Sequence, residues 1–165
     1  MRERLVLGTL TLAAVLAVGS CKDDVGLTSI PPDPERFIAF LNGANEPTAV
    51  ATPALGQAVI TVDGNSLIYR IDVSNIDNAT AAHIHKGFAG QNGGVMVPLF
   101  GGPATAVDFS GVLVEDTVVV VDSVLTHMRG GQAYVNVHTT SPGCTPGTPG
   151  CNVGGEIRGQ VFRFQ

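Results

Sequence analysis

The sequence reads QAVITVDGNSLIYRIDV over residues 57–73, and this stretch predicts a β-hairpin. Asp63-Gly64 favours a tight turn, because this pair adopts the positive φ angles that such turns need. After the turn, apolar and polar side chains alternate. One face carries Leu67, Tyr69, Ile71 and Val73, and the other carries Arg70 and Asp72. This period of two residues is typical of a strand that packs one face against a core.

The rest of the chain repeats this β pattern. Short β-prone runs between Gly/Pro turns predict strands over residues 37–41, 57–62, 67–73, 81–85, 95–99, 107–114, 118–121, 133–139 and 156–164. Residues 122–129 are the one helical candidate, with Asp122 as the expected N-cap and Gly130 as the stop. Glu115 and Asp116 are expected as solvated charges at a turn or an edge. Short, closely spaced strands favour an antiparallel sandwich or Greek-key barrel.

Residues 1–20 predict a lipoprotein signal peptide. A short basic start precedes residues 5–18, which are mostly apolar but too short to read as a membrane-spanning helix. Val18-Gly19-Ser20-Cys21 resembles the bacterial lipobox, in which small residues precede a cysteine that receives a diacylglycerol. An ordinary signal peptide or a buried N-terminal helix is the alternative. We therefore expect a lipid anchor on Cys21 that holds the protein at a membrane.

The sequence after the signal divides into a tether and one domain. Residues 21–35 contain three prolines and no periodicity, which indicates a flexible tether. Residues 36–165 are β-patterned throughout and have the length of one ordinary domain. Lys22-Asp23-Asp24 resembles, shifted by one residue, a surface-export signal of some bacterial lipoproteins. We therefore expect a place in the bacterial cell envelope, at the outer membrane or cell surface rather than the inner membrane.

Charge argues against nucleic acid as a partner. Cleavage removes Arg2, Arg4 and Glu3, so that the 9 basic and 14 acidic residues of the chain become 7 and 13, a formal net charge of −6. No basic stripe or aromatic-basic cluster is visible, and nucleic-acid binding is therefore not expected. Charged residues make up only 14% of the chain, which fits a folded core rather than a disordered chain.

The remaining two cysteines, Cys144 and Cys151, lie in a Pro/Gly-rich stretch of an exported chain. An even pair in an oxidising compartment favours a structural disulfide that closes this small loop. Metal ligation by the two thiolates is the weaker alternative.

Four segments resemble known family motifs. They are LNGANEP (residues 41–47), AHIHKG (82–87), YVNVHT (134–139) and GEIRGQ (155–160). In this order they resemble the CHRD domain, named from chordin and widespread in bacterial secreted and lipid-anchored proteins. The resemblance runs from about Phe37 to Phe162. The stretch that contains both cysteines departs from it, because the third and fourth motifs are normally joined by a short turn.

The resemblance implies an all-β, antiparallel Greek-key β-sandwich, immunoglobulin-like or Cu,Zn superoxide dismutase-like, with one short helix. It implies little about activity, because a fold does not determine function. The growth-factor antagonism of animal chordin is not carried over to a single bacterial domain. The first hypothesis is therefore a non-enzymatic binding or structural module whose envelope or extracellular partner the sequence does not name.

Three histidines form a candidate metal site. His83 and His85 share one face of a predicted strand, while Ile84 points to the other. His138 lies on the polar face of residues 133–139. Three neutral imidazoles suit copper or zinc, and dismutases with a similar sandwich use such a pair. His127, in the helical segment, is expected at the surface.

A structural polar network is the alternative to metal binding. The histidines would then bond to Asn136, Thr139 or Glu156 and fasten the loops at one end of the sandwich. Glu156 and Arg158 share a strand face and are expected to form an ion pair or hydrogen-bond network.

Enzymatic activity is not expected. The glycine-rich residues 87–94 lack a phosphate-loop context, and no serine has the setting of a nucleophile elbow. A small redox or hydrolytic metalloenzyme is the weakest alternative.

Overall fold

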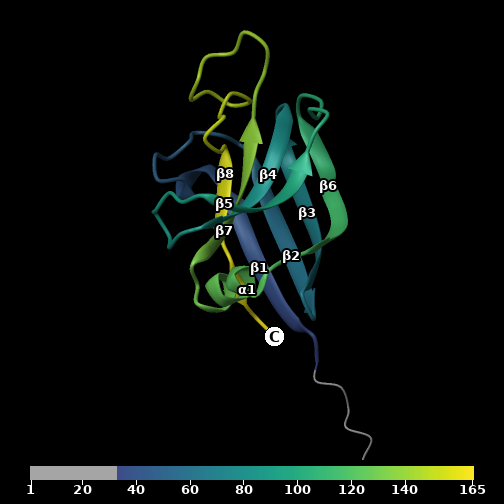
Figure 1. Ribbon diagram of the computed structural model, residues 1–165. Coiled ribbons are helices and arrows are strands. Elements are labelled where there is room, and N and C mark those ends of the chain that lie inside the picture. The colour runs from purple at the N-terminus through teal and green to yellow at the C-terminus, as the bar shows by residue number, and fades with distance from the viewer. Residues whose placement is uncertain (1–32) are drawn as a thin grey trace, which may run out of the picture. The chain divides into compact units, whose positions relative to one another are not determined.

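A computed structural model describes residues 33–165, and these form nine strands, one α-helix and a short 3-10 helix (Figure 1). The strands are β1 (Glu35–Asn42), β2 (Leu55–Asp63), β3 (Ser66–Ile76), β4 (Ala79–Lys86), β5 (Val95–Gly101), β6 (Phe109–Val119), β7 (Ala133–Thr139), β8 (Ile157–Gln160) and β9 (Phe162–Arg163). The helices are α1 (Asp122–Arg129) and the 3-10 helix η1 (Gly43–Asn45). Within this part of the chain, no helix is long and apolar enough to cross a membrane. The predicted signal peptide and Cys21 lie outside the described residues.

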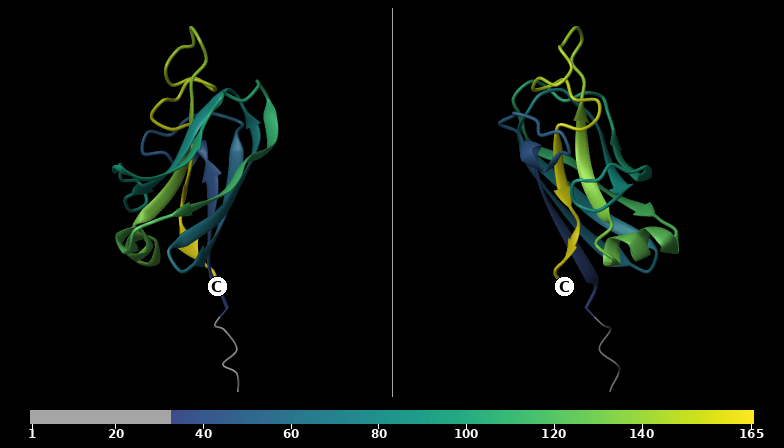
Figure 2. Two further views of the ribbon diagram at one scale, coloured as in Figure 1. Left: turned by 45° about the vertical axis from the view of Figure 1, so that its right-hand side comes forward. Right: turned by 90° about the vertical axis from the view of Figure 1, so that its left-hand side faces the viewer.

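The strands form one antiparallel sheet in the order β5-β4-β7-β8-β1-β2-β3-β6, and β9 pairs with β1. The β3–β6 and β4–β7 neighbours are not consecutive in the chain, so the connections cross over as in a Greek key. The sheet curls round until the end strands β5 and β6 come near each other (Figures 1 and 2). The predicted antiparallel all-β fold with one short helix is therefore confirmed, and its strands form a single, nearly closed sheet.

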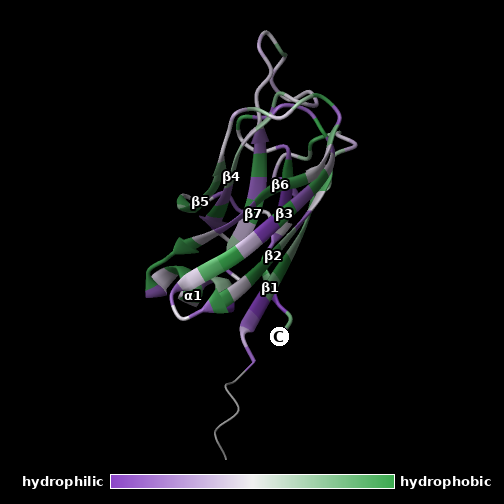
Figure 3. Ribbon diagram, turned by 90° about the vertical axis from the view of Figure 1, so that its right-hand side faces the viewer, coloured by the Kyte–Doolittle hydropathy of each residue, from purple (hydrophilic) through white to green (hydrophobic). Residues whose placement is uncertain are grey.

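The hairpin of β2 and β3 follows the predicted alternation. The two strands pair down to Asp63 and Ser66, and Gly64 supplies a φ of 58° at the turn. The predicted apolar face, Leu67, Tyr69, Ile71 and Val73, is buried in the core. On the outer face, Arg70 forms ion pairs with Asp72 and, across to β6, with Glu115. Figure 3 shows hydrophobic and hydrophilic residues following one another along these strands.

Two predicted boundaries are wrong. The strands predicted over 107–114 and 118–121 are one strand, β6, because an edge strand leaves Glu115 and Asp116 exposed to water and a turn is not needed. The strand predicted over 156–164 is interrupted at Val161, whose N–H bonds to Ala133 instead, so that β8 and β9 are separate.

The helix α1 spans the predicted residues, but its predicted cap is wrong. Val121 is the N-cap and makes no side-chain capping bond. Asp122 is the first helical residue, and its carboxylate accepts a hydrogen bond from Asn65 in the β2–β3 turn. The apolar side chains of Val124, Leu125 and Met128 pack into the core. Residues 140–156, between β7 and β8, form an insert that contains both cysteines. The helix lies at the end of the sheet opposite this insert (Figure 1).

Candidate metal centre

The pairing of β4 with β7 brings the three predicted histidines together. Ala81 is opposite His138 and His83 is opposite Asn136, so that His83 and His138 are diagonal neighbours. Because side chains alternate along both strands, Ile84 and Val137 enter the core while the histidines lie on the other face. One ring nitrogen of each histidine lies within 4.8 Å of the other two.

Backbone carbonyls orient two of these rings. The Nδ1 atom of His85 lies 2.9 Å from the carbonyl oxygen of Gly93, and Nδ1 of His138 lies 2.9 Å from that of Val153. A ring nitrogen that faces a carbonyl must carry the proton, so the Nε2 atoms of both rings keep their lone pairs. The Nε2 atom of His138 lies 2.9 Å from Nδ1 of His83. These two nitrogens are close enough either to share a hydrogen bond or to face one ion.

The Nε2 atom of His85 is a buried acceptor without a partner. The residue is 8% exposed, and this atom meets no hydrogen-bond geometry within residues 33–165, while the nearby Asn136 side chain acts on the pKa of the ring. A buried, unsatisfied polar atom costs about 1–3 kcal/mol.

The spacing of the nitrogens lies on both sides of that in a metal site. Zn–N bonds are about 2.0–2.1 Å long, so two nitrogens of a tetrahedral site are about 3.4 Å apart. The His83–His138 contact of 2.9 Å is shorter than this, and other separations in the cluster run up to 4.8 Å. The rings would therefore have to rotate to hold one ion.

Burial keeps all three rings neutral at neutral pH. Burial, with smaller contributions from the nearby His83 and His85 rings, lowers the pKa of His138 to about 4. Burial likewise lowers the pKa of His83 and His85. The neutral imidazole is the form that binds metal ions.

An aromatic and a cationic side chain support the cluster. The Tyr134 ring stacks on His85 with 5.0 Å between centroids, and the Arg158 guanidinium lies 3.3 Å from the centroid of Tyr134. Arg158 is fully buried and donates to the carbonyl oxygens of Phe88 and Gln91. The loop that supplies the Gly93 carbonyl for His85 is therefore fixed by Arg158.

Glu46 is a member of this region that the sequence analysis did not single out. It is 8% exposed, and burial raises its pKa to about 7 against the opposing effects of the Arg158 charge and the nearby Asn136 amide. Its Oε1 atom has no partner among the described residues. Glu46 also lines a cavity of about 360 Å³ between residues 46–50 and the insert. Its place in the 41–47 motif was the only sequence signal.

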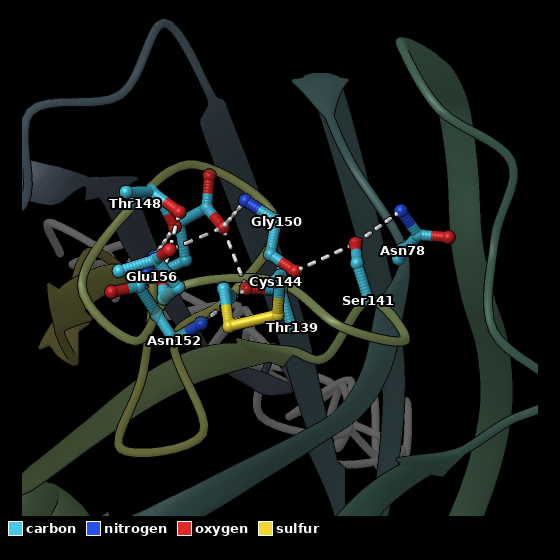
Figure 4. The surroundings of a disulfide bond; sticks show 10 residues. Asn78, Thr139, Ser141, Cys144, Thr148, Gly150, Asn152 and Glu156 are labelled. Carbon is cyan, nitrogen blue, oxygen red and sulfur yellow. Dashed lines mark hydrogen bonds between the residues drawn. A yellow bond between two sulfur atoms is a disulfide. The ribbon is translucent and has the colours of Figure 1, made fainter.

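Glu156 and Arg158 form neither the expected ion pair nor a hydrogen bond with each other. The ion pairs within residues 33–165 involve Arg70, Arg129 and Arg163. Glu156 is fully buried and accepts hydrogen bonds from the hydroxyls of Thr52 and Thr139, the N–H of Gly150 and the amide of Asn152 (Figure 4). The two residues therefore belong to separate networks, because Glu156 faces the insert and Arg158 faces the 87–94 loop.

The predicted disulfide between Cys144 and Cys151 is confirmed. It closes the insert between β7 and β8, next to the Glu156 network (Figure 4). The helical His127 is partly buried and lies against Gln132, away from the cluster.

A comparison with known protein families supports the resemblance that the four sequence motifs indicate. The family model for the CHRD domain matches residues 37–161, which is most of the chain. No curated protein and no solved structure matches. Since the matched range runs from β1 to the end of β8 and contains all three histidines, the chain belongs to the CHRD domain family.

Proposed function

We propose that this protein is a metal-binding module of the bacterial cell envelope, which holds copper or zinc through His83, His85 and His138 and is anchored by lipid on Cys21. The observation that carries the proposal is the buried, unpartnered Nε2 of His85, in a cluster where one ring nitrogen of each histidine lies within 4.8 Å of the other two. A metal ion at this point would satisfy a polar atom that is otherwise buried at a cost.

The hydrogen bonds made by the other ring nitrogens of His85 and His138 also support a metal site. Metal-binding histidines usually donate their other ring N–H to a carboxylate or backbone carbonyl, which fixes the ring and its tautomer. His85 and His138 both do so, through Gly93 and Val153. Imidazole ligands suit copper and zinc, and three of them leave a fourth position for water or another ligand. The proposal is limited to binding and includes no catalytic step.

A structural role without metal is the second candidate. The 2.9 Å contact between His83 and His138 favours it, because a hydrogen bond there would satisfy both nitrogens. On this alternative the cluster only joins β4 to β7, and the CHRD domain acts as a structural or protein-binding module.

Metal content decides between these candidates. The mature, lipid-bearing protein should be purified without an affinity tag and its copper and zinc measured by mass spectrometry, beside His83→Ala/His85→Ala and His127→Ala variants. We expect about one ion per chain, lost in the double variant and kept in His127→Ala, which removes a histidine outside the cluster. The proposal would be contradicted by a protein that is purified without metal and whose melting temperature and absorption spectrum do not change when Cu(II) or Zn(II) is added.

The anchor is tested separately. Cys21→Ala should prevent incorporation of labelled fatty acid and release the protein from the membrane fraction. Protease accessibility on intact cells then tells surface display from a periplasmic position. An unchanged membrane fraction would argue against lipid attachment at Cys21.

A further inference from the structure

The disulfide-closed insert has a direct connection to the histidine cluster. Its chain returns to β8 through Asn152 and Val153, and the Val153 carbonyl accepts the hydrogen bond from Nδ1 of His138. This bond keeps Nε2 of His138 deprotonated and directed at His83. The orientation of one candidate ligand thus depends on where the insert places a single peptide group.

Only a few contacts hold that peptide group in place. The side chain of Val153 is 68% exposed and contributes no buried anchor. The preceding Asn152 accepts from the Thr139 N–H through its carbonyl and donates its N–H to the Thr139 hydroxyl. Its side-chain amide donates to the Thr148 carbonyl and to Glu156. Cys151, immediately before it, is 5% exposed and covalently fixed to Cys144.

Apart from the covalent link, the insert is held by hydrogen bonds and not by apolar packing. Residues 141–150 are Ser, Pro, Gly, Thr and the one cysteine, with no large apolar side chain to pack against the core. Such a segment gains little from burial, while its chain entropy opposes a single conformation. The disulfide removes most of that freedom by closing the loop.

We propose that the Cys144–Cys151 disulfide positions His138 for metal binding, so that the redox state of this cysteine pair regulates the metal affinity of the cluster. The inference rests on the proposed metal site and extends it. With the bond intact, the Val153 carbonyl holds the His138 tautomer. After reduction, only hydrogen bonds hold the 151–153 segment, and the His138 ring is oriented less strictly.

The chemistry requires an external dithiol reductant, such as a thioredoxin-like protein or dithiothreitol. One thiolate of the reductant attacks Sγ of Cys144, which is partly exposed, and Cys151 leaves as a thiolate that takes up a proton. The second reductant thiol then releases Cys144 from the mixed disulfide. Two electrons pass to the protein, and the reductant becomes a disulfide.

The test compares the zinc affinity of a variant without the disulfide with that of a variant that is only less stable. Cys144→Ser/Cys151→Ser removes the bond without adding thiolate ligands, and zinc affinity is measured by competition with a chromogenic chelator. We expect a 10–100-fold weaker affinity, the usual effect of losing a group that orients a ligand. Val62→Ala, a core truncation in the β2–β3 hairpin, is the control that lowers stability without touching the insert. It should leave the affinity unchanged.

If the serine variant does not fold, a second variant and a spectroscopic measurement still test the proposal. Asn152→Ala keeps both cysteines but removes the side-chain ties to Thr148 and Glu156, and it should also weaken zinc binding. The 15N shifts of His138 in the metal-free protein should show one tautomer with the disulfide and a mixture without it.

The outcomes separate the two proposals. Equal zinc affinity in wild type and both insert variants, with an unchanged His138 tautomer, would overturn the positioning role and leave the metal site standing. If the oxidised wild type itself binds no metal, the proposed function fails first, whereas the tautomer measurement still reports whether the insert orients His138.

Discussion

At the scale of single residues, the most consequential groups are buried polar side chains with incomplete bonding. Glu46 is the clearest case, because its carboxyl is enclosed between η1, Asn136 and Gly155 and one oxygen has no partner among the described residues. Burial favours the neutral acid. The folded protein therefore holds a proton on this carboxyl at pH values where the unfolded chain has released it.

This raised pKa predicts how stability depends on pH. The pKa of Glu46 is about 7 in the folded state, against 4.5 for an ordinary glutamate, so its contribution is fully present below about pH 4.5 and is lost as the pH rises through 7. Each pKa unit corresponds to about 1.4 kcal/mol. Glu46→Gln should therefore flatten the fall in unfolding free energy between pH 5 and pH 8, measured by urea denaturation. Parallel curves for wild type and variant would contradict the assignment.

Gly155 gives a second prediction at this scale. Its φ is 127°, and a Cβ there would collide with the Glu46 carboxylate and the Asn136 amide. Gly155→Ala should therefore cost about 2–4 kcal/mol of unfolding free energy. Gly64→Ala is the matched control, since Gly64 also has a positive φ but has open space around it, and it should cost only about 1 kcal/mol. Equal losses in thermal or urea unfolding would show that crowding at Gly155 is unimportant.

The candidate site shows which residues a sequence can and cannot reveal. The alternation of strands predicts that His83 and His85 share a face and that His138 lies on the polar face of its own strand, and the β4–β7 pairing brings the three together. The carbonyls of Gly93 and Val153 are not predictable in this way, because any residue type supplies a carbonyl and only the loop path decides its position. Glu46 was missed for a related reason: its burial depends on contacts with β7 and β8 that lie far away in the sequence.

At the scale of elements, period and turn chemistry are enough to place the strands but not their ends. The β2–β3 hairpin follows from Asp63-Gly64 and the alternation after it. The length of β6 does not, because two acidic residues look like a turn unless one knows that the strand is at an edge. The Asp122 cap was wrong because its carboxylate accepts from Asn65 in another element.

The junction of β7, the insert and β8 depends on Glu156. Its carboxylate is fully buried and accepts from hydroxyl, amide and backbone donors. Glu156→Gln replaces an acceptor by an amide N–H₂ that must face one of these donors, so we expect a loss of about 2–4 kcal/mol in unfolding free energy. Thr148→Ala, at an exposed hydroxyl within the insert, should change it by less than about 0.5 kcal/mol. Comparable values in denaturant titrations would mean that Glu156 does not organise the junction.

At the scale of the whole molecule, a bound metal should stabilise the entire domain. A ligand that binds only the folded state adds about 2.7 kcal/mol at one hundred times its dissociation constant. For a domain of this size that corresponds to a rise of roughly 10 °C in melting temperature. Calorimetry with and without zinc should show this rise in wild type and not in His83→Ala/His85→Ala. An equal rise in both proteins would place the ion elsewhere.

The position of β1 has a mechanical consequence. This strand lies inside the sheet, with β2 paired along all eight of its residues and β8 and β9 on its other side. It enters the domain at the end opposite the disulfide-closed insert (Figure 1). A pull between a partner held near the insert and the chain preceding Glu35 would run along the axis of β1. The hydrogen bonds on both its edges would then bear the load together, in shear, and the domain should resist extraction by force better than one anchored through a peripheral strand.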